Sequence, residues 1–367
     1  MYDRRTVLQA IGTGAIAGVT GCSAGGLPGN GGADGARTVT DGAGREISLS
    51  ERVERVVAVG PGALRQVAYL GATDRVVGVE DAESDWLREV PYNLANPGLR
   101  EKTVIGSAGP NAGGNAEEIL SVDPDVIFFY GDPSRAETLQ KQTETPVVVL
   151  RITGLGGEDE RQQLFDTWEL VGEILGIEDQ ASELETFVAE TIDDLGDHIS
   201  DLDDDERASA YAGAISYKGA HGLATTRRRF PPFAFTGVEN VASSLDTDAA
   251  SVQISEETLL TWDPGTIFID SNNLGRARED LSNNDAFDRL TAVEDGEVYT
   301  LLPHASYHHN YGSILANAYF VGTTLYPDRF GSVDLGSKVD SIFEAMLGAP
   351  LYDELIDAYD AYRRLEV

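Results

Sequence analysis

The sequence predicts an α/β protein of two Rossmann-like lobes joined by a long, rigid α-helix. Short apolar runs alternate with amphipathic segments, which is the pattern of βα units. Residues 115–129 recur at residues 255–269, an offset of 140 without a gap. Residues 159–200, between the two copies, have helical spacing and no strand pattern. With 367 residues, the chain is long enough for two lobes.

The first 21 residues have the features of an export signal. Arg4 and Arg5 precede residues 7–21, an uncharged stretch that is short for a membrane span but suits a signal peptide. The arginine pair resembles a twin-arginine signal. Residues 19–22 (VTGC) resemble a lipobox, whose Cys22 would carry lipid. The alternative is a structural cysteine that ends a membrane anchor. We expect a protein anchored by lipid at the outer face of the cell membrane.

The boundaries of the expected parts follow from composition. The glycine-rich residues 22–36 predict a flexible tether, so folding should start near Arg37. We expect a first α/β lobe over residues 37–178, a linker helix over 179–200, a second α/β lobe over 201–335, and C-terminal helices over 336–367.

Individual elements follow from apolar spacing. Strands are expected over residues 55–59, 76–79, 125–130 and 146–150, and a short helix over 63–70. Apolar residues spaced three or four apart predict one helix that ends near Gly176 and another over 179–199. The C-terminal part predicts helices over 312–325, 337–347 and 350–364. A long helix between two lobes makes a stiff connection, so we expect a small closure motion.

The repeat gives both copies the same physical plan. Asn115 or Ser255 should cap a short helix, an Asp-Pro pair should end it, and a buried strand should follow. Any helix, Asp-Pro and strand unit could converge on such a pattern. A gapless alignment over 15 positions, six of them identical, instead favours two lobes of like topology.

The composition excludes several functions. A net charge of −35, from 62 acidic and 27 basic residues, argues against a nucleic-acid or anionic-lipid partner and suggests a halophilic source. The single cysteine excludes an intramolecular disulfide, and no Cys-x-x-Cys or His-Glu-x-x-His pattern offers a zinc site. No Gly-x-Ser-x-Gly elbow or phosphate-binding loop with Lys-Ser/Thr supports an enzyme.

Several segments in a fixed order resemble a known family. They are residues 54–61 (ERVVAVGP), 69–79 (YLGATDRVVGV), 115–120 (NAEEIL) and 124–127 (PDVI), followed by the helical linker. The chain resembles the solute-binding proteins of ABC importers for iron-siderophores, haem and cobalamin. Residues 217–222, 315–319 and 325–328 are similar to a subgroup in which Tyr307 and Asn310 match a Tyr-x-x-Asn pattern. His308 and His309 depart from that pattern.

The resemblance implies partners and docking residues. An ABC permease with its ATPase would receive the ligand, and one glutamate in each lobe, Glu117 and Glu257, would dock onto permease arginines. Both residues can also be interpreted as acidic residues in the first turn of a helix, where they interact favourably with the helix dipole. A monomer with no intrinsic cofactor is expected.

The candidate ligand residues lie in loops after the predicted strands, where ligands of open α/β sheets bind. Residues 304–311 hold three of the five histidines, and imidazole or tyrosinate could face a metal chelate. Arg65 and Lys218 are favoured as anion-binding cations over residues 227–229, because three successive arginines are more often a solvated turn or a salt-bridged surface. The candidates are Arg65, Glu80, Asn115, Tyr130, Tyr217, Lys218, His221, Asn272, His304, Tyr307, His308, His309, Asn310 and Tyr311.

The expected function is therefore capture of an iron or cobalt chelate and its delivery to the permease, without catalysis. Two alternatives stay open. One is a receptor for a free transition-metal ion, which would need several convergent ligands. The other is a secreted hydrolase of the α/β type.

Overall fold

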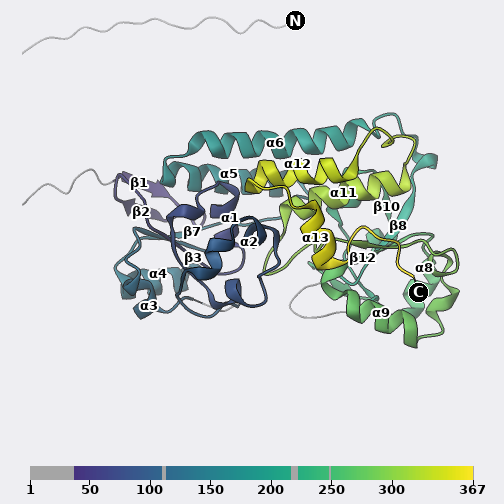
Figure 1. The fold of residues 1–367 in the computed structure, drawn as a ribbon, viewed down its shortest axis with the longest axis horizontal. Coiled ribbons are helices and arrows are strands. Elements are labelled where there is room, and N and C mark those ends of the chain that lie inside the picture. The colour runs from purple at the N-terminus through teal and green to yellow at the C-terminus, as the bar shows by residue number, and fades with distance from the viewer. Residues whose placement is uncertain (1–36, 110–112, 216–221, 248, 367) are drawn as a thin grey trace, which may run out of the picture. The chain divides into compact units, whose positions relative to one another are not determined.

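The computed structural model describes residues 37–109, 113–215, 222–247 and 249–366. Within these ranges, two parallel β-sheets are each covered by helices on both faces (Figure 1). We call each sheet with its helices a lobe. No helix in these ranges is both long enough and apolar enough to cross a lipid bilayer.

The first lobe contains a five-stranded sheet in the order β5-β4-β3-β6-β7, with every neighbouring pair parallel. Alternate residues of β3 and β6 point to opposite faces, one packed against α1 and the other against α3 and α4. This double burial explains why these strands are runs of valine, isoleucine and phenylalanine. The elements are β3 (Val56–Val59), β4 (Val76–Val79), β5 (Thr103–Val104), β6 (Val126–Phe129), β7 (Val147–Val149), α1 (Ala63–Tyr69), α2 (Pro91–Ala95), α3 (Ala116–Ser121) and α4 (Pro133–Thr143).

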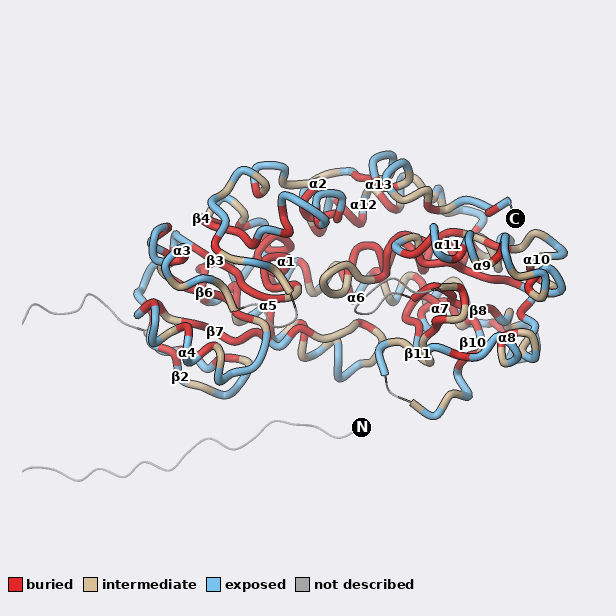
Figure 2. Tube along the Cα trace, turned by 90° about the horizontal axis from the view of Figure 1, so that it is seen from below, coloured by how far each residue is buried: buried red, intermediate tan, exposed pale blue. Residues whose placement is uncertain are grey.

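The second lobe contains a four-stranded parallel sheet in the order β10-β8-β12-β13. One face packs against α8, α9 and α10, and the other against α7 and α11. Figure 2 shows the buried strands of both lobes against paler, exposed loops. The elements are β8 (Ser209–Gly213), β10 (Glu239–Asn240), β12 (Ile267–Asp270), β13 (Val298–Leu301), α7 (Pro231–Phe235), α8 (Glu256–Trp262), α9 (Leu274–Asn283) and α10 (Thr291–Glu294), with a small ribbon of β9 (Thr225–Thr226) and β11 (Val252–Gln253).

The internal repeat is confirmed as a repeat of topology. The Asn115 side chain accepts hydrogen bonds from the first turn of α3, and Ser255 does the same for α8. Each helix leads into a strand that lies between two parallel partners, β6 between β3 and β7, and β12 between β8 and β13. One detail differs from expectation. Asp123 and Asp263, which precede the prolines, take left-handed φ angles of 45° and 41° and are not extended.

Two long helices connect the lobes. Helix α5 (Glu158–Leu175) ends at Gly176, which has a left-handed φ of 65°, and α6 (Glu178–Asp197) follows at once. Helix α6 packs along α5 and then against α7 and α11 of the second lobe (Figure 1). The indole N–H of the buried Trp168 in α5 donates to Gln66 Oε1 at 2.8 Å. A helix is therefore present where the linker helix over residues 179–200 was expected, with the bounds Glu178–Asp197.

The C-terminal part contains α11 (Tyr311–Leu325), α12 (Leu335–Leu347) and α13 (Tyr352–Tyr359). The prediction of a helix to residue 364 was wrong. Asp360 has a left-handed φ of 49° and ends α13. Residues after it run beside β13, where the Tyr362 and Leu365 amides donate to the Thr300 and Val298 carbonyls. The chain thus covers an edge of the second sheet that would otherwise be unpaired.

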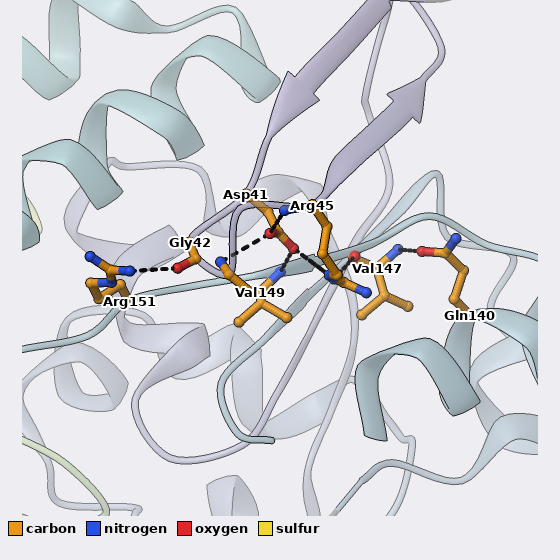
Figure 3. A network of polar contacts seen from close by, with 8 residues as sticks. Asp41, Gly42, Arg45, Gln140, Val147, Val149 and Arg151 are labelled. Carbon is orange, nitrogen blue, oxygen red and sulfur yellow. Dashed lines mark hydrogen bonds and ion pairs between the residues drawn. The ribbon is translucent and has the colours of Figure 1, made fainter. Parts of the chain in front are cut away.

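Strands β1 (Arg37–Thr40) and β2 (Glu46–Leu49) form an N-terminal hairpin. The buried Asp41 joins this hairpin to the edge strand β7 through hydrogen bonds (Figure 3). Its Oδ1 accepts from the Arg45 amide at 2.9 Å, and its Oδ2 accepts from the Arg45 guanidinium at 2.6 Å and from the Val149 amide at 3.0 Å. Gly42 is required beside it, since a Cβ there would lie 2.9 Å from the Val149 carbonyl oxygen. The described part of the chain therefore starts with a hairpin that is held against the first sheet.

Replacing Asp41 with Asn should lower the free energy of unfolding by about 3 kcal/mol, because it leaves the Arg45 charge without its buried partner. Urea titration at fixed salt measures this. Glu54→Gln is the matched control, since Glu54 pairs with Arg52 on the surface and such pairs contribute about 0–1 kcal/mol. Equal losses in the two variants would show that Asp41 does not anchor the hairpin.

Candidate functional site

Residues 304–311 leave the carboxyl end of β13 and reach the first lobe. The loop is closed by the Asn310 amide, which donates to the His304 carbonyl at 3.0 Å. Its main chain and side chains contact residues from α1, from the loop after β3 and from the loop after β4. The geometry therefore brings together parts of the sequence that are more than 190 residues apart.

Arg65 links the two lobes through its side chain. It lies on α1 and is 1% exposed. Its guanidinium donates to the His309 carbonyl at 2.6 Å and to the Ser306 carbonyl at 2.7 Å. The Tyr92 ring lies beneath it, 5.0 Å from the guanidinium carbon. In the described part of the chain, no carboxylate forms an ion pair with Arg65, so its charge is stabilised by the two carbonyl dipoles and the Tyr92 ring, with Glu83 further away.

Tyr307 makes a second link. Its backbone takes a left-handed φ of 60°, which is uncommon for a tyrosine. The hydroxyl accepts from the Gly109 amide at 2.7 Å and lies 3.1 Å from Glu80 Oε2. The half-exposed Trp86 packs edge-on against the Tyr307 ring, with ring centroids 5.2 Å apart. These contacts hold the Tyr307 backbone in its left-handed conformation and offset the strain of that conformation.

Three histidines form a continuous row of rings across the lobes. The centroid of His309 lies 5.4 Å from that of His304 and 4.9 Å from that of His308. His308 in turn packs edge-on against Tyr130 at 5.0 Å. His308 also lies over Gly62, where an added Cβ would be 2.7 Å from the His308 Cβ. Gly62 is therefore needed for the close approach of the loop to the first lobe.

Arg227 belongs to this site, which the sequence analysis missed. It follows β9 directly, and its guanidinium donates to His304 Nε2. Burial lowers the Arg227 pKa to about 10, so the side chain is still charged at neutral pH. The interpretation of residues 227–229 as a solvated turn was wrong for this residue. The only signal in the sequence that could have identified Arg227 was its proximity to two other candidates, since it lies ten residues or fewer after Tyr217 and Lys218.

The protonation states make the site electropositive. Burial lowers the pKa of His308 to about 3 and holds the pKa values of His304 and His309 well below their usual range, so all three are neutral at pH 7. Burial also raises the pKa of three nearby carboxyls, to about 8 for Glu80 and about 7 for Glu83 and Asp270. The two guanidiniums therefore carry the permanent charge.

Several buried polar atoms of this region have no hydrogen-bond partner among the described residues. They are Arg65 Nε, Ser271 Oγ, Asn310 Oδ1 and the Nδ1 atoms of His304, His308 and His309. Buried polar groups are normally paired, so this concentration marks a place suited to a ligand. Over the same residues, no group of three or more His, Cys, Asp or Glu side chains has the geometry to hold a metal ion.

The other candidate residues have varied positions. Tyr311 is buried and donates to the Thr153 carbonyl at 2.6 Å, Asn310 donates to the Pro303 carbonyl at 3.0 Å, and the exposed Asn272 contacts the Ala305 carbonyl at 3.3 Å. The Asn115 side chain is used as a helix cap, away from the row of rings. Cys22, Tyr217, Lys218 and His221 lie outside the described residues.

The two glutamates aligned by the repeat have equivalent positions. Glu117 lies in the first turn of α3 and Glu257 in the first turn of α8, and both are exposed. The described residues provide no buried ion pair for either side chain. Both carboxylates are therefore free to meet a partner at the surface.

Comparison with known proteins agrees with this architecture. Residues 56–305 match the family model described as periplasmic binding protein. The molybdate-binding protein MolA of Haemophilus influenzae is 26% identical over 330 residues, which cover 84% of this chain and 90% of the relative. Its solved structure with molybdate superposes with a TM-score of 0.68 at 22% identity, covering 86% of this chain and 98% of that one.

Two further relatives carry other ligands in their names. The cobalamin-binding protein of Halobacterium salinarum is 24% identical over 232 residues, covering 63% of this chain and 57% of the relative. The Fe(3+)-citrate-binding protein YfmC of Bacillus subtilis is 25% identical over 245 residues, covering 62% and 73%. Since the family model covers more than half of the sequence, the chain belongs to the periplasmic binding proteins, which serve ABC transporters as solute receptors and are not enzymes.

Proposed function

We propose that this chain captures a small oxyanion, or a metal chelate with anionic oxygens, between its two lobes and delivers it to an ABC importer. The observation that carries the proposal is the pair of guanidiniums, Arg65 and Arg227, gathered around three neutral imidazoles. In the described residues neither guanidinium forms an ion pair with a carboxylate. A ligand with negative oxygens would supply the missing partner.

The electrostatics favour an anion over a metal cation. Burial raises the pKa of Glu80 to about 8 and the pKa values of Glu83 and Asp270 to about 7, so at neutral pH Glu80 is mostly protonated and the other two carry only part of their negative charge. A free transition-metal ion would meet two fixed positive charges instead. These two features argue against the alternative of a free-metal receptor.

Among anions, the relatives support two classes. MolA binds molybdate, a compact oxyanion, and YfmC is named for ferric citrate, a chelate with carboxylate oxygens. Molybdate is the first choice, because MolA matches most of both chains and because the donors here are compactly arranged. An iron or cobalt chelate stays as the second candidate, supported by YfmC and the cobalamin-binding relative.

The delivery step would use the surface glutamates. Glu117 and Glu257 occupy equivalent exposed positions on the two lobes, which suits a permease with two matching basic sites.

We also propose that Cys22 carries the lipid anchor after twin-arginine export. Mass spectrometry of the mature N-terminus would test this through the added lipid mass. The net charge of −35 supports function at high salt, where self-repulsion is screened.

Isothermal titration calorimetry tests the ligand class, with molybdate, ferric citrate, cyanocobalamin, Ni²⁺ and Zn²⁺ as the compounds added. We expect an anion to bind, and Arg65→Lys to weaken it about tenfold or more, since lysine lacks the two-pronged donor geometry. Arg75→Lys is the matched control, because Arg75 also donates to two main-chain carbonyls but lies outside the site. Binding of metal cations alone, or equal effects of both variants, would refute the proposal.

The pH dependence of affinity should separate an anion from a cation. As pH rises from 6 to 9, Glu80, Glu83 and Asp270 ionise and add negative charge, so an anion should bind more weakly and a cation more tightly. One added charge about 7 Å from the ligand, at an effective dielectric constant of about 20, costs roughly 2 kcal/mol, or more than tenfold in affinity. Glu80→Gln should reduce this slope. Affinity for the anion that rises with pH would contradict the assignment.

Reversing both surface charges should uncouple capture from delivery. The double variant Glu117→Lys and Glu257→Lys should abolish uptake by cells that carry the importer, because like charges would face each other at both docking sites. Ligand affinity of the purified variant should equal that of the wild type. Reversal of Glu118 and Glu256, the neighbouring exposed acids, controls for net charge. Lost ligand affinity in the first variant, or equal loss of uptake in both, would disprove docking through this pair.

A further inference from the structure

The contact between Arg227 and His304 determines which nitrogen of the imidazole carries the proton. Arg227 follows β9, and His304 begins the loop after β13, so the contact joins two loops of the second lobe. A guanidinium has only donors, so His304 Nε2 must be the acceptor. Burial holds the His304 pKa well below its usual range, and the ring is neutral. A neutral imidazole that accepts at Nε2 has its proton on Nδ1.

His304 Nδ1 is therefore a buried N–H donor, and it has no acceptor among the described residues. The rest of the residue is fixed in place. Its backbone amide donates to Asp270 Oδ2 at 3.0 Å, and its ring packs against Phe230 and His309 with centroids 5.5 and 5.4 Å away. At 2% exposed, the side chain has no route to bulk water for this hydrogen bond. Leaving such a donor unpaired is costly, which points to an acceptor supplied by a ligand.

We infer that His304 is a specificity-determining residue that offers a neutral N–H donor to an oxygen of the anionic ligand, and that Arg227 is a positioning residue that fixes this tautomer. The inference rests on the proposed function, since it assumes an anionic ligand. It assigns different roles to the residues that would bind the ligand. Guanidiniums supply charge, whereas His304 selects an unprotonated oxygen that can accept.

Two side chains can imitate the two imidazole nitrogens separately. The amide nitrogen of asparagine occupies the place of Nδ1, and that of glutamine the place of Nε2. His304→Asn should therefore bind molybdate about tenfold more tightly than His304→Gln, the range expected for one hydrogen bond to a charged group. Calorimetry at pH 7 measures the difference. Similar molar volume and polarity make each variant the control for the other.

The tautomer itself can be read without any ligand. In ¹⁵N-histidine-labelled protein, with the His304 signals assigned from their loss in His304→Asn, long-range ¹H–¹⁵N correlation should show the proton on Nδ1. Arg227→Met should shift His304 toward the Nε2–H form, and Arg227→Lys, which can still donate, should restore Nδ1–H. A merely structural role of Arg227 would leave the tautomer unchanged.

The outcomes separate this inference from the function on which it rests. If the wild type binds neither molybdate nor another anion, the proposed function fails. If the wild type binds molybdate but the proton is on Nε2, or His304→Gln binds as tightly as His304→Asn, the inference fails and the function stands. Tighter binding by His304→Asn together with an Nδ1–H signal that depends on Arg227 supports both.

Discussion

The site depends on one interaction, the pair of hydrogen bonds from Arg65 to the carbonyls of Ser306 and His309. They hold a loop of the second lobe against a helix of the first, and so determine where His308 meets Gly62 and where Tyr307 meets Glu80. Carbonyl oxygens satisfy the geometry of a guanidinium without neutralising it. The buried charge therefore remains available to a ligand, which an ion pair with a carboxylate would have prevented.

To bind an anion as proposed, a chain with a net charge of −35 needs a positive local potential at the site within a negative overall charge. Two features contribute to it. Burial raises the pKa of Glu80 to about 8 and the pKa values of Glu83 and Asp270 to about 7, which reduces their negative charge near the site, while most ionised carboxylates lie at the surface. In salt near 1 M the Debye length is about 3 Å, so those surface charges act weakly on a ligand beneath them. The local guanidiniums then dominate the field that the ligand meets.

Much of the fold was predictable because it rests on local patterns. Buried strands such as Val56–Val59 are apolar on both faces, and the caps Asn115 and Ser255 act within their own helices. The site was only partly predictable. The histidine-rich loop stood out by composition, but the role of Arg227 depends on a contact 77 residues away with His304. The prediction of where α13 ends was wrong for a similar reason. The helical pattern continues in the sequence to residue 364, but the residues after Asp360 instead pair with β13.

The same contacts determine how a ligand can enter. Residues 304–311 already bind the first lobe in this structure, so exchange requires the two bonds of Arg65 to break, at about 1.5–3 kcal/mol each for charged donors. The two bonds together amount to roughly 3–6 kcal/mol, which leaves an open state populated below about 1% in the absence of ligand. Because α6 connects the lobes as one continuous helix, that opening should be small. The proposed anion could bond to Arg65 Nε, which has no partner among the described residues, so that the two carbonyl contacts can form again around it as the lobes close.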